Sequence, residues 1–101
     1  MRAKEFFAEL PAKVDPERIA DIDAGYVFDV TGEGIWLVRL HNGTLTVTEG
    51  PDEDGDVKFT LSGETFDRIT ERKQNPMIAY MTGKVKVSGD IAAAANLQKI
   101  L

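Results

Sequence analysis

The hydrophobic pattern at the start of the chain predicts two short helices. Four apolar residues recur at the i, i+3, i+4, i+7 spacing of one helix face, namely Ala3, Phe6, Phe7 and Leu10. We expect Pro11 to end this helix, because proline removes a backbone donor and clashes with the preceding turn. Asp15 followed by Pro16 is typical of a helix N-cap and the first helical position. A second helix should therefore begin here and end near residues 21–25.

From Tyr26 onward the apolar residues recur at every second position, which indicates strands. Five segments are predicted as strands, at residues 26–30, 35–40, 44–48, 57–61 and 84–88. Asn42-Gly43 separates the second from the third and is a strong hairpin signal, since both positions favour positive φ. The last three strands alternate apolar residues with Thr, Lys or Ser. We therefore expect one apolar and one solvent-exposed face, which is typical of antiparallel sheets.

Three more helices are predicted in the second half of the chain. Each starts with a good capping residue, namely Ser62, Asn75 before Pro76, and Asp90, and Gly83 is expected to end the second helix. Their apolar positions are Phe66 and Ile69 in the first, Met77, Ile78 and Met81 in the second, and Ala93, Leu97, Ile100 and Leu101 in the third. The third helix contains the alanine run 92–95 and is expected to continue to the last residue.

These elements predict an α+β fold. We expect a five-stranded, largely antiparallel sheet with helices covering one face, because the apolar side of the sheet must be covered and only the helices can cover it. The length of 101 residues suits a single domain over residues 1–101. The sequence has no internal repeat, low-complexity tract or linker that would divide it.

Composition and charge exclude several classes of function. The chain has a net charge of −5, so we expect no binding to nucleic acid, which depends on neutralising phosphates with Lys and Arg. It has no cysteine, which excludes disulfides, thiolate catalysis and cysteine-ligated metals. No apolar run approaches the ~20 residues that span a bilayer. The N-terminus does not resemble a signal peptide, and Lys99-Ile100-Leu101 is not the Ser-Lys-Leu peroxisomal signal, so a cytoplasmic location is expected.

Candidate catalytic chemistry is sparse. His41 is the only histidine; it stands beside the Asn-Gly turn with no serine nucleophile near it in sequence, so we interpret it as a solvated turn residue. The alternating aspartates Asp52, Asp54 and Asp56 resemble the start of a calcium loop. However, Val57 and Gly63 occupy the positions where such a loop requires glycine and glutamate. We expect no catalytic residue, no metal site and no cofactor.

Several short segments, taken together in order and spacing, resemble the sterol carrier protein 2 (SCP2) sterol-binding domain family. They are Val27–Gly32, Trp36, Asp56-Val57, Asn75-Pro76, Ala79–Met81, Gly83-Lys84, Lys86, Gly89-Asp90 and Leu97-Gln98. The resemblance implies a five-stranded sheet layered with helices that enclose an apolar tunnel. It also implies noncovalent binding, and often transfer, of a lipid ligand such as a fatty acid, fatty acyl-CoA, phospholipid or sterol-like molecule.

A lipid site requires concave apolar surface with few polar groups, and apolar residues of the predicted helices and inner strand faces could supply it. The candidate lipid-binding residues are Trp36, Phe59, Phe66, Ile69, Met77, Ile78, Met81, Leu97, Ile100 and Leu101. The alternative interpretation is that each of them is ordinary core, because amphipathic stripes usually serve packing. Met77 and Met81 favour binding, since flexible thioethers suit adaptable surfaces.

Two further interpretations involve partners. An apolar groove also suits a homo-oligomeric or accessory interaction domain that accepts a partner helix, so a homodimer is compatible with the sequence. Five basic residues of the second half, Arg68, Arg72, Lys73, Lys84 and Lys86, would favour transient membrane contact through anionic head groups if they formed one patch. The alternative is that they line the solvated faces of a helix and a strand.

Overall fold

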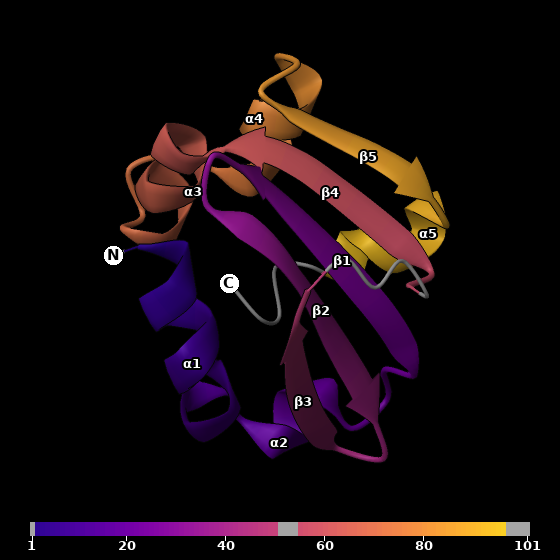
Figure 1. The fold of residues 1–101 in the computed structure, drawn as a ribbon. Helices are drawn as coiled ribbons and strands as arrows, with labels where there is room; N and C mark the ends of the chain where they lie inside the picture. Colours follow the sequence, from indigo (N-terminus) through magenta and orange to yellow (C-terminus); the bar gives the residue numbers. More distant parts are fainter. Residues whose placement is uncertain (1, 51–54, 97–101) are drawn as a thin grey trace.

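The computed structural model describes residues 2–50 and 55–96, and its elements form a sheet with helices beside and behind it (Figure 1). The helices of this part of the chain are α1 (Ala3–Lys13), α2 (Pro16–Ile19), α3 (Gly63–Thr70), α4 (Pro76–Met81) and α5 (Ile91–Ala94). The strands are β1 (Ala24–Thr31), β2 (Gly34–His41), β3 (Thr44–Glu49), β4 (Val57–Ser62) and β5 (Val85–Gly89). The last helix was predicted to continue to Leu101; α5 ends at Ala94, residues 95–96 are a turn of 3-10 helix, and residues 97–101 lie outside the described part.

The strands form one mixed sheet in the order β3-β2-β1-β4-β5. β1–β2, β2–β3 and β4–β5 pair antiparallel, whereas β1 and β4 pair parallel. The β2–β3 hairpin turns at Asn42 and Gly43, whose φ angles of 51° and 76° are the positive values that the sequence predicts. The predicted α+β class, with a largely antiparallel five-stranded sheet and helices on one face, is confirmed.

The inner face of the sheet forms the core. It carries large apolar side chains such as Tyr26, Phe28 and Val38, each at most 2% exposed, while the outer positions of β3, β4 and β5 carry Thr, Lys and Ser. On the outer side of β1 and β2, Val27 and Leu37 face each other and are buried as well. Gly55 lies against Val27, and a Cβ at Gly55 would come within 2.6 Å of it.

The helices cover the inner face in two parts (Figure 1). α1 contacts β2 and β3, whereas α4 and α5 contact β5, with α3 and α5 also against β4. Under α1 the core is a cluster of aromatic rings. Phe7 stacks on Trp36 at a centroid distance of 4.9 Å and contacts Phe28 and Phe66 at 5.2 and 5.4 Å. Rings of this size bury a large apolar area and fill this half of the core.

All four helix starts that were predicted from capping residues are confirmed by hydrogen bonds to the cap side chain. Asp15 accepts from the Glu17 N–H, Ser62 from Thr65, Asn75 from Met77 and Ile78, and Asp90 from Ala93. These bonds satisfy donors that the first helical turn leaves without an intrahelical partner. The Asn75 and Asp90 caps therefore set where α4 and α5, the two short helices that contact β5, begin.

Two predicted helix ends are wrong. α1 continues two residues past Pro11, because a proline so close to the C-terminus removes only one hydrogen bond and the Val14 N–H still donates to the Leu10 carbonyl at 3.0 Å. α2 ends at Ile19 and not near residues 21–25, since the chain has to turn there into β1.

Polar contacts help to fix α5 to the sheet, because none of its four residues is fully buried and only Ala93 and Ala94 pack, half-buried, against the core. The Tyr26 hydroxyl on β1 donates to the Ala93 carbonyl at 2.8 Å, and the Asp90 N–H donates to the Asp56 carbonyl at 2.9 Å. Burial raises the pKa of Tyr26; the Asn96 side chain lowers that pKa, and Asp56 and Asp90 raise it. The neutral hydroxyl is therefore the form that holds α5 in place.

Replacing Tyr26 by phenylalanine should lower the free energy of unfolding by about 1 kcal/mol near neutral pH, because one hydrogen bond is lost. This difference should shrink above pH 10, where tyrosine in the unfolded state ionises at its ordinary pKa of 10.0 while native Tyr26 stays neutral. Wild type then loses stability with rising pH that the variant does not lose. Urea unfolding followed by Trp36 fluorescence measures both effects. Equal stability of the two proteins at neutral pH would show that the hydroxyl does not hold α5.

Gly89 and Gly83 offer a matched test of how β5 is positioned. Both have positive φ, 98° and 81°, but a Cβ on Gly89 would collide with the Asp56 carbonyl oxygen, whereas one on Gly83 would meet no atom within 4 Å. Gly83→Ala should therefore cost about 1 kcal/mol for the backbone conformation alone, and Gly89→Ala about 3 kcal/mol or more, because β5 must also shift. Urea unfolding of both variants measures the difference. Equal losses would contradict the close β4–β5 contact.

Candidate functional site

The core is incomplete between the sheet and α3, α4 and α5. A pocket of about 180 Å³ lies there. Its described lining residues are Phe28, Phe59, Leu61, Phe66, Ile69, Pro76, Met77, Tyr80, Val85, Val87, Ile91, Ala94 and Ala95. No charged side chain occurs among them, and the Tyr80 hydroxyl is the one polar side-chain group of this described lining.

The sheet supplies the floor of the pocket. In the β4–β5 register Phe59 pairs with Val87 and Leu61 with Val85. Because alternate residues of a strand share a face, all four side chains point to the same side. Phe28 on β1 pairs with Phe59, and their rings stack at a centroid distance of 5.2 Å.

The pocket reaches the surface between α4 and α5. Phe66 and Ile69 of α3 are only 1% and 6% exposed and form the inner wall. Met77 and Tyr80, three residues apart on one side of α4, are 46% and 42% exposed, and Ile91 at the start of α5 is 52% exposed. These three residues line the pocket and also face solvent, so they form its mouth.

The opposite wall is made of small residues. Ala94 and Ala95 line the pocket from α5 and the residue that follows it. The Tyr26 hydroxyl, which could otherwise offer a polar contact here, donates to the Ala93 carbonyl. The described lining can therefore accommodate a hydrocarbon group by burying it, and it offers only the Tyr80 phenol to a polar group of a ligand.

The ten predicted binding residues fall into four groups. Phe59, Phe66, Ile69 and Met77 line the pocket; Trp36 is buried elsewhere; Ile78 and Met81 are 54% and 78% exposed; and Leu97, Ile100 and Leu101 lie outside the described residues. The structure thus brings four of the seven described candidates together.

The three described candidates outside the pocket have simple physical reasons for their positions. Trp36 lies on β2, two strands away from β4, and stacks on Phe7 of α1. Ile78 lies about 100° around α4 from Met77, and Met81, one turn beyond Met77, is the last residue of α4 and lies outside the pocket lining. An apolar stripe in the sequence does not reveal which part of the core it faces.

Nine lining residues were not among the candidates: Phe28, Leu61, Pro76, Tyr80, Val85, Val87, Ile91, Ala94 and Ala95. The alternation of Val85 and Val87 with Lys84 and Lys86 was a usable signal, because it places both valines on the apolar face of a strand. Their position beside Phe59 and Leu61 depends on the β4–β5 register, which no local pattern specifies.

The polar groups considered in the sequence lie away from the pocket. His41 Nδ1 is 3.4 Å from Asp23 Oδ1 with an imidazole that is 63% exposed, so it occupies the solvated turn that was expected. The described residues contain no group of three or more His, Cys, Asp or Glu placed to hold a metal ion. Asp52 and Asp54 are outside the described part.

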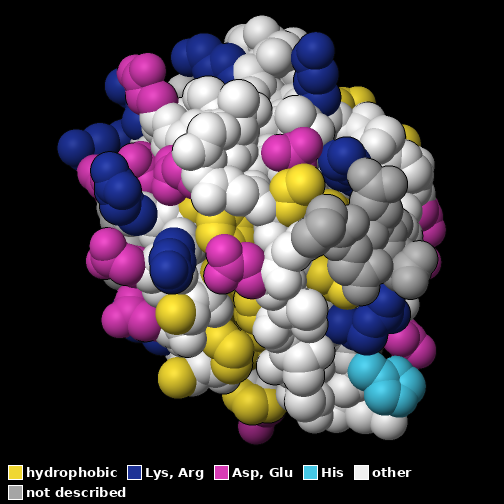
Figure 2. All heavy atoms as spheres, viewed as in Figure 1, with side chains coloured by type: hydrophobic (Ala, Val, Ile, Leu, Met, Phe, Trp, Pro, Cys, Tyr) yellow, Lys and Arg dark blue, Asp and Glu magenta, His cyan; other side chains and the backbone are white. Residues whose placement is uncertain are grey.

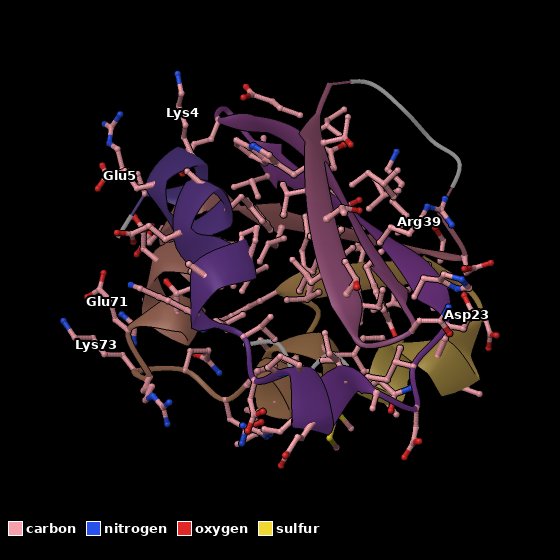
Figure 3. All side chains as sticks on the ribbon, turned by 90° about the horizontal axis from the view of Figure 1, so that it is seen from below. Lys4, Glu5, Asp23, Arg39, Glu71 and Lys73 are labelled. Atoms are coloured by element: carbon pink, nitrogen blue, oxygen red, sulfur yellow. The ribbon has the colours of Figure 1, made fainter. Side chains whose placement is uncertain are left out.

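The basic residues of the second half do not form one patch. Arg68 and Lys73 line a polar groove together with Glu64, Asp67 and Glu71, and Lys73 Nζ is 3.3 Å from Glu71 Oε1. Lys86 alternates with Val85 and Val87 and therefore lies on the outer face of the sheet. In Figure 2, acidic and basic side chains are intermixed over the α1 and α3 side, and in Figure 3 Glu71 and Lys73 both point outward. The described part of the chain contains no helix long and apolar enough to cross a membrane.

Comparison with known proteins gives sequence relatives that are much longer than this chain. Hydroxysteroid dehydrogenase-like protein 2 of Xenopus tropicalis is 33% identical in an alignment 101 positions long, which covers 97% of this chain and 24% of that protein. The chain thus spans about a quarter of the length of such curated relatives. A stereoselective inverting sec-alkylsulfatase, Pisa1 of a Pseudomonas species, contains a similar fold at a TM-score of 0.84 and 25% identity, covering all of this chain and 16% of the enzyme.

A second solved structure has nearly the same extent as this chain. Sterol carrier protein 2 of Yarrowia lipolytica, in its apo form, superimposes at a TM-score of 0.73 with 29% identity, covering 95% of this chain and 84% of that protein. The sequence profile of the SCP-2 sterol transfer family matches residues 3–101. The fold, the sequence and the profile agree, and the chain belongs to the SCP-2 sterol transfer family.

Proposed function

We propose that this chain binds the hydrocarbon part of a lipid noncovalently in the pocket between β4, β5 and α3–α5, and carries it without chemical change. The observation that supports this most strongly is the pocket itself, which combines an apolar lining with a mouth open to the surface. Fatty acids, fatty acyl-CoA, phospholipids and sterol-like molecules all offer such a part. The name of the Yarrowia relative, sterol carrier protein 2, agrees with the proposal.

The size of the pocket indicates how much of a lipid it encloses. An engineered apolar cavity of about 150 Å³ holds one benzene molecule, so a pocket of about 180 Å³ holds about seven carbon atoms by the same measure. Each buried methylene contributes about 0.8 kcal/mol. The rest of a long chain, or its polar head, would then emerge between Met77, Tyr80 and Ile91.

An empty pocket also has an energetic cost. An enclosed cavity costs about 24 cal/mol per Å³, so an empty pocket of 180 Å³ that opens at its mouth costs at most about 4 kcal/mol, against the ~5–15 kcal/mol of a typical domain. A bound chain would remove much of this cost. Binding of a lipid in the pocket should therefore raise the free energy of unfolding, which can be measured without an assay of lipid transfer.

Protein purified from cells should carry lipid, and removing it with organic solvent should lower the melting temperature, because the void is then empty. Adding saturated fatty acids should restore it. Affinity should rise with chain length up to about seven carbons and then flatten, because further methylenes lie outside the pocket. Mass spectrometry of the extract and thermal melts measure these effects. A bare polypeptide that no fatty acid stabilises would contradict the proposal.

Filling the pocket from its alanine wall gives a matched pair of variants. Ala94 lines the pocket, whereas Ala92 on the same helix is exposed and does not. Ala94→Phe should remove fatty-acid binding while leaving the apo protein as stable as wild type or more stable, because the ring occupies the void. Ala92→Phe should bind normally. Titration calorimetry with dodecanoic acid and urea unfolding measure the two properties; equal binding by both variants would place the lipid elsewhere.

A further inference from the structure

The pocket mouth contains one side chain that can form a hydrogen bond. Its three residues are Met77, Tyr80 and Ile91, and only the tyrosine carries a polar group. Tyr80 is 42% exposed, and within the part of the chain that the structure describes its hydroxyl makes no hydrogen bond. A phenol O–H at the edge of an apolar pocket is therefore available to a ligand.

The opposite rim of the mouth is the start of α5, and its capping residue is an acid. Asp90 directly precedes the mouth residue Ile91, and Asp90 Oδ1 accepts a hydrogen bond from the Ala93 N–H at 3.2 Å. No Lys or Arg occurs among the described lining residues. An anionic head group at the mouth would find no cation in this lining and would approach the carboxylate of Asp90.

A lipid should enter this pocket with its hydrocarbon end first. A polar group placed against Phe59 or Val87 would lose its hydrogen bonds to water without gaining a partner, whereas each methylene gains by burial. The polar end therefore stays at the mouth. Because the pocket holds about seven carbon atoms, the polar atom of an eight-carbon chain would lie at the level of Tyr80.

We infer that Tyr80 makes the pocket selective for a medium-chain lipid whose uncharged oxygen, that of an alcohol, ketone or ester, lies about eight carbons from the buried end. The phenol O–H donates to this oxygen in place of water. The inference rests on the proposed function and narrows it. The head group of a longer chain lies beyond Tyr80 in water and gains nothing from the hydroxyl.

An ionised head group is disfavoured at the same position. The mouth withdraws it partly from water, and a charge that loses water without gaining a partner of opposite charge is unfavourable. The Tyr80 hydroxyl offers one hydrogen bond, but Asp90 repels the charge. An eight-carbon carboxylate should therefore bind less tightly than the eight-carbon alcohol, and this difference should shrink for twelve carbons, because both heads then lie in water.

Lys84 is the main alternative anchor for a head group. It follows α4, its backbone N–H donates to the Ala79 carbonyl at 2.8 Å, and it is exposed but does not line the pocket. A head group bound by Lys84 would have to be anionic, which gives the opposite selectivity. The affinity of octanoate relative to octan-1-ol therefore distinguishes Lys84 from Tyr80.

Calorimetry tests the inference, with the delipidated whole chain titrated near neutral pH into octan-1-ol, octanoate, dodecan-1-ol or dodecanoate. Wild type should bind octan-1-ol about tenfold or more tightly than octanoate, and dodecan-1-ol within about threefold of dodecanoate. The comparison between chain lengths is needed because an alcohol is always less polar than a carboxylate. Only a head group held at the mouth makes the preference depend on chain length.

The two tyrosines of the chain give a matched pair of variants. Tyr80→Phe removes the hydroxyl at the mouth, whereas Tyr26→Phe removes one that donates to the Ala93 carbonyl from outside the lining. Tyr80→Phe should weaken octan-1-ol binding about fivefold and change dodecan-1-ol binding by less than about twofold. Tyr26→Phe should change both affinities by the same factor, because it acts through α5. Circular dichroism checks that both variants are folded.

The other outcomes also decide the matter. Equal effects of Tyr80→Phe on the two alcohols would overturn the role of its hydroxyl. Octanoate binding as tight as that of octan-1-ol would overturn the selectivity, and a loss of octanoate binding in Lys84→Gln would assign the head group to that lysine. If all four ligands bind without either preference, this inference fails and the proposed function stands. If none binds, both fail.

Discussion

The structure depends on covering the inner face of a five-stranded sheet with helices of unequal length. α1, with 11 residues, covers the β2 and β3 side, whereas α4 and α5, with six and four residues, contact β5 on the other side. Leaving any part of this apolar face exposed to water is unfavourable, so helices or large side chains have to cover all of it. Large rings complete the cover beneath α1, while short helices with small or flexible side chains leave a space beneath α4 and α5.

That space persists because the elements around it are fixed by contacts that do not depend on filling it. The Asn75 cap and the Asp90 cap set where α4 and α5 begin, and the Tyr26 hydroxyl holds α5 through the Ala93 carbonyl. Collapse of the pocket would have to break these hydrogen bonds or move β5, where Gly89 lies against the Asp56 carbonyl. The pocket is thus maintained by polar contacts at its margins, although its lining is apolar.

The sequence was sufficient for what is local and insufficient for what depends on pairing. Caps such as Ser62 and the Asn42-Gly43 turn were predicted correctly, because each acts within a few residues. Trp36 was placed in the binding site, yet it stacks on Phe7, because the strand order that separates β2 from β4 leaves no trace in either strand. The same limit applies to Val87, whose place in the pocket follows from its register with Phe59.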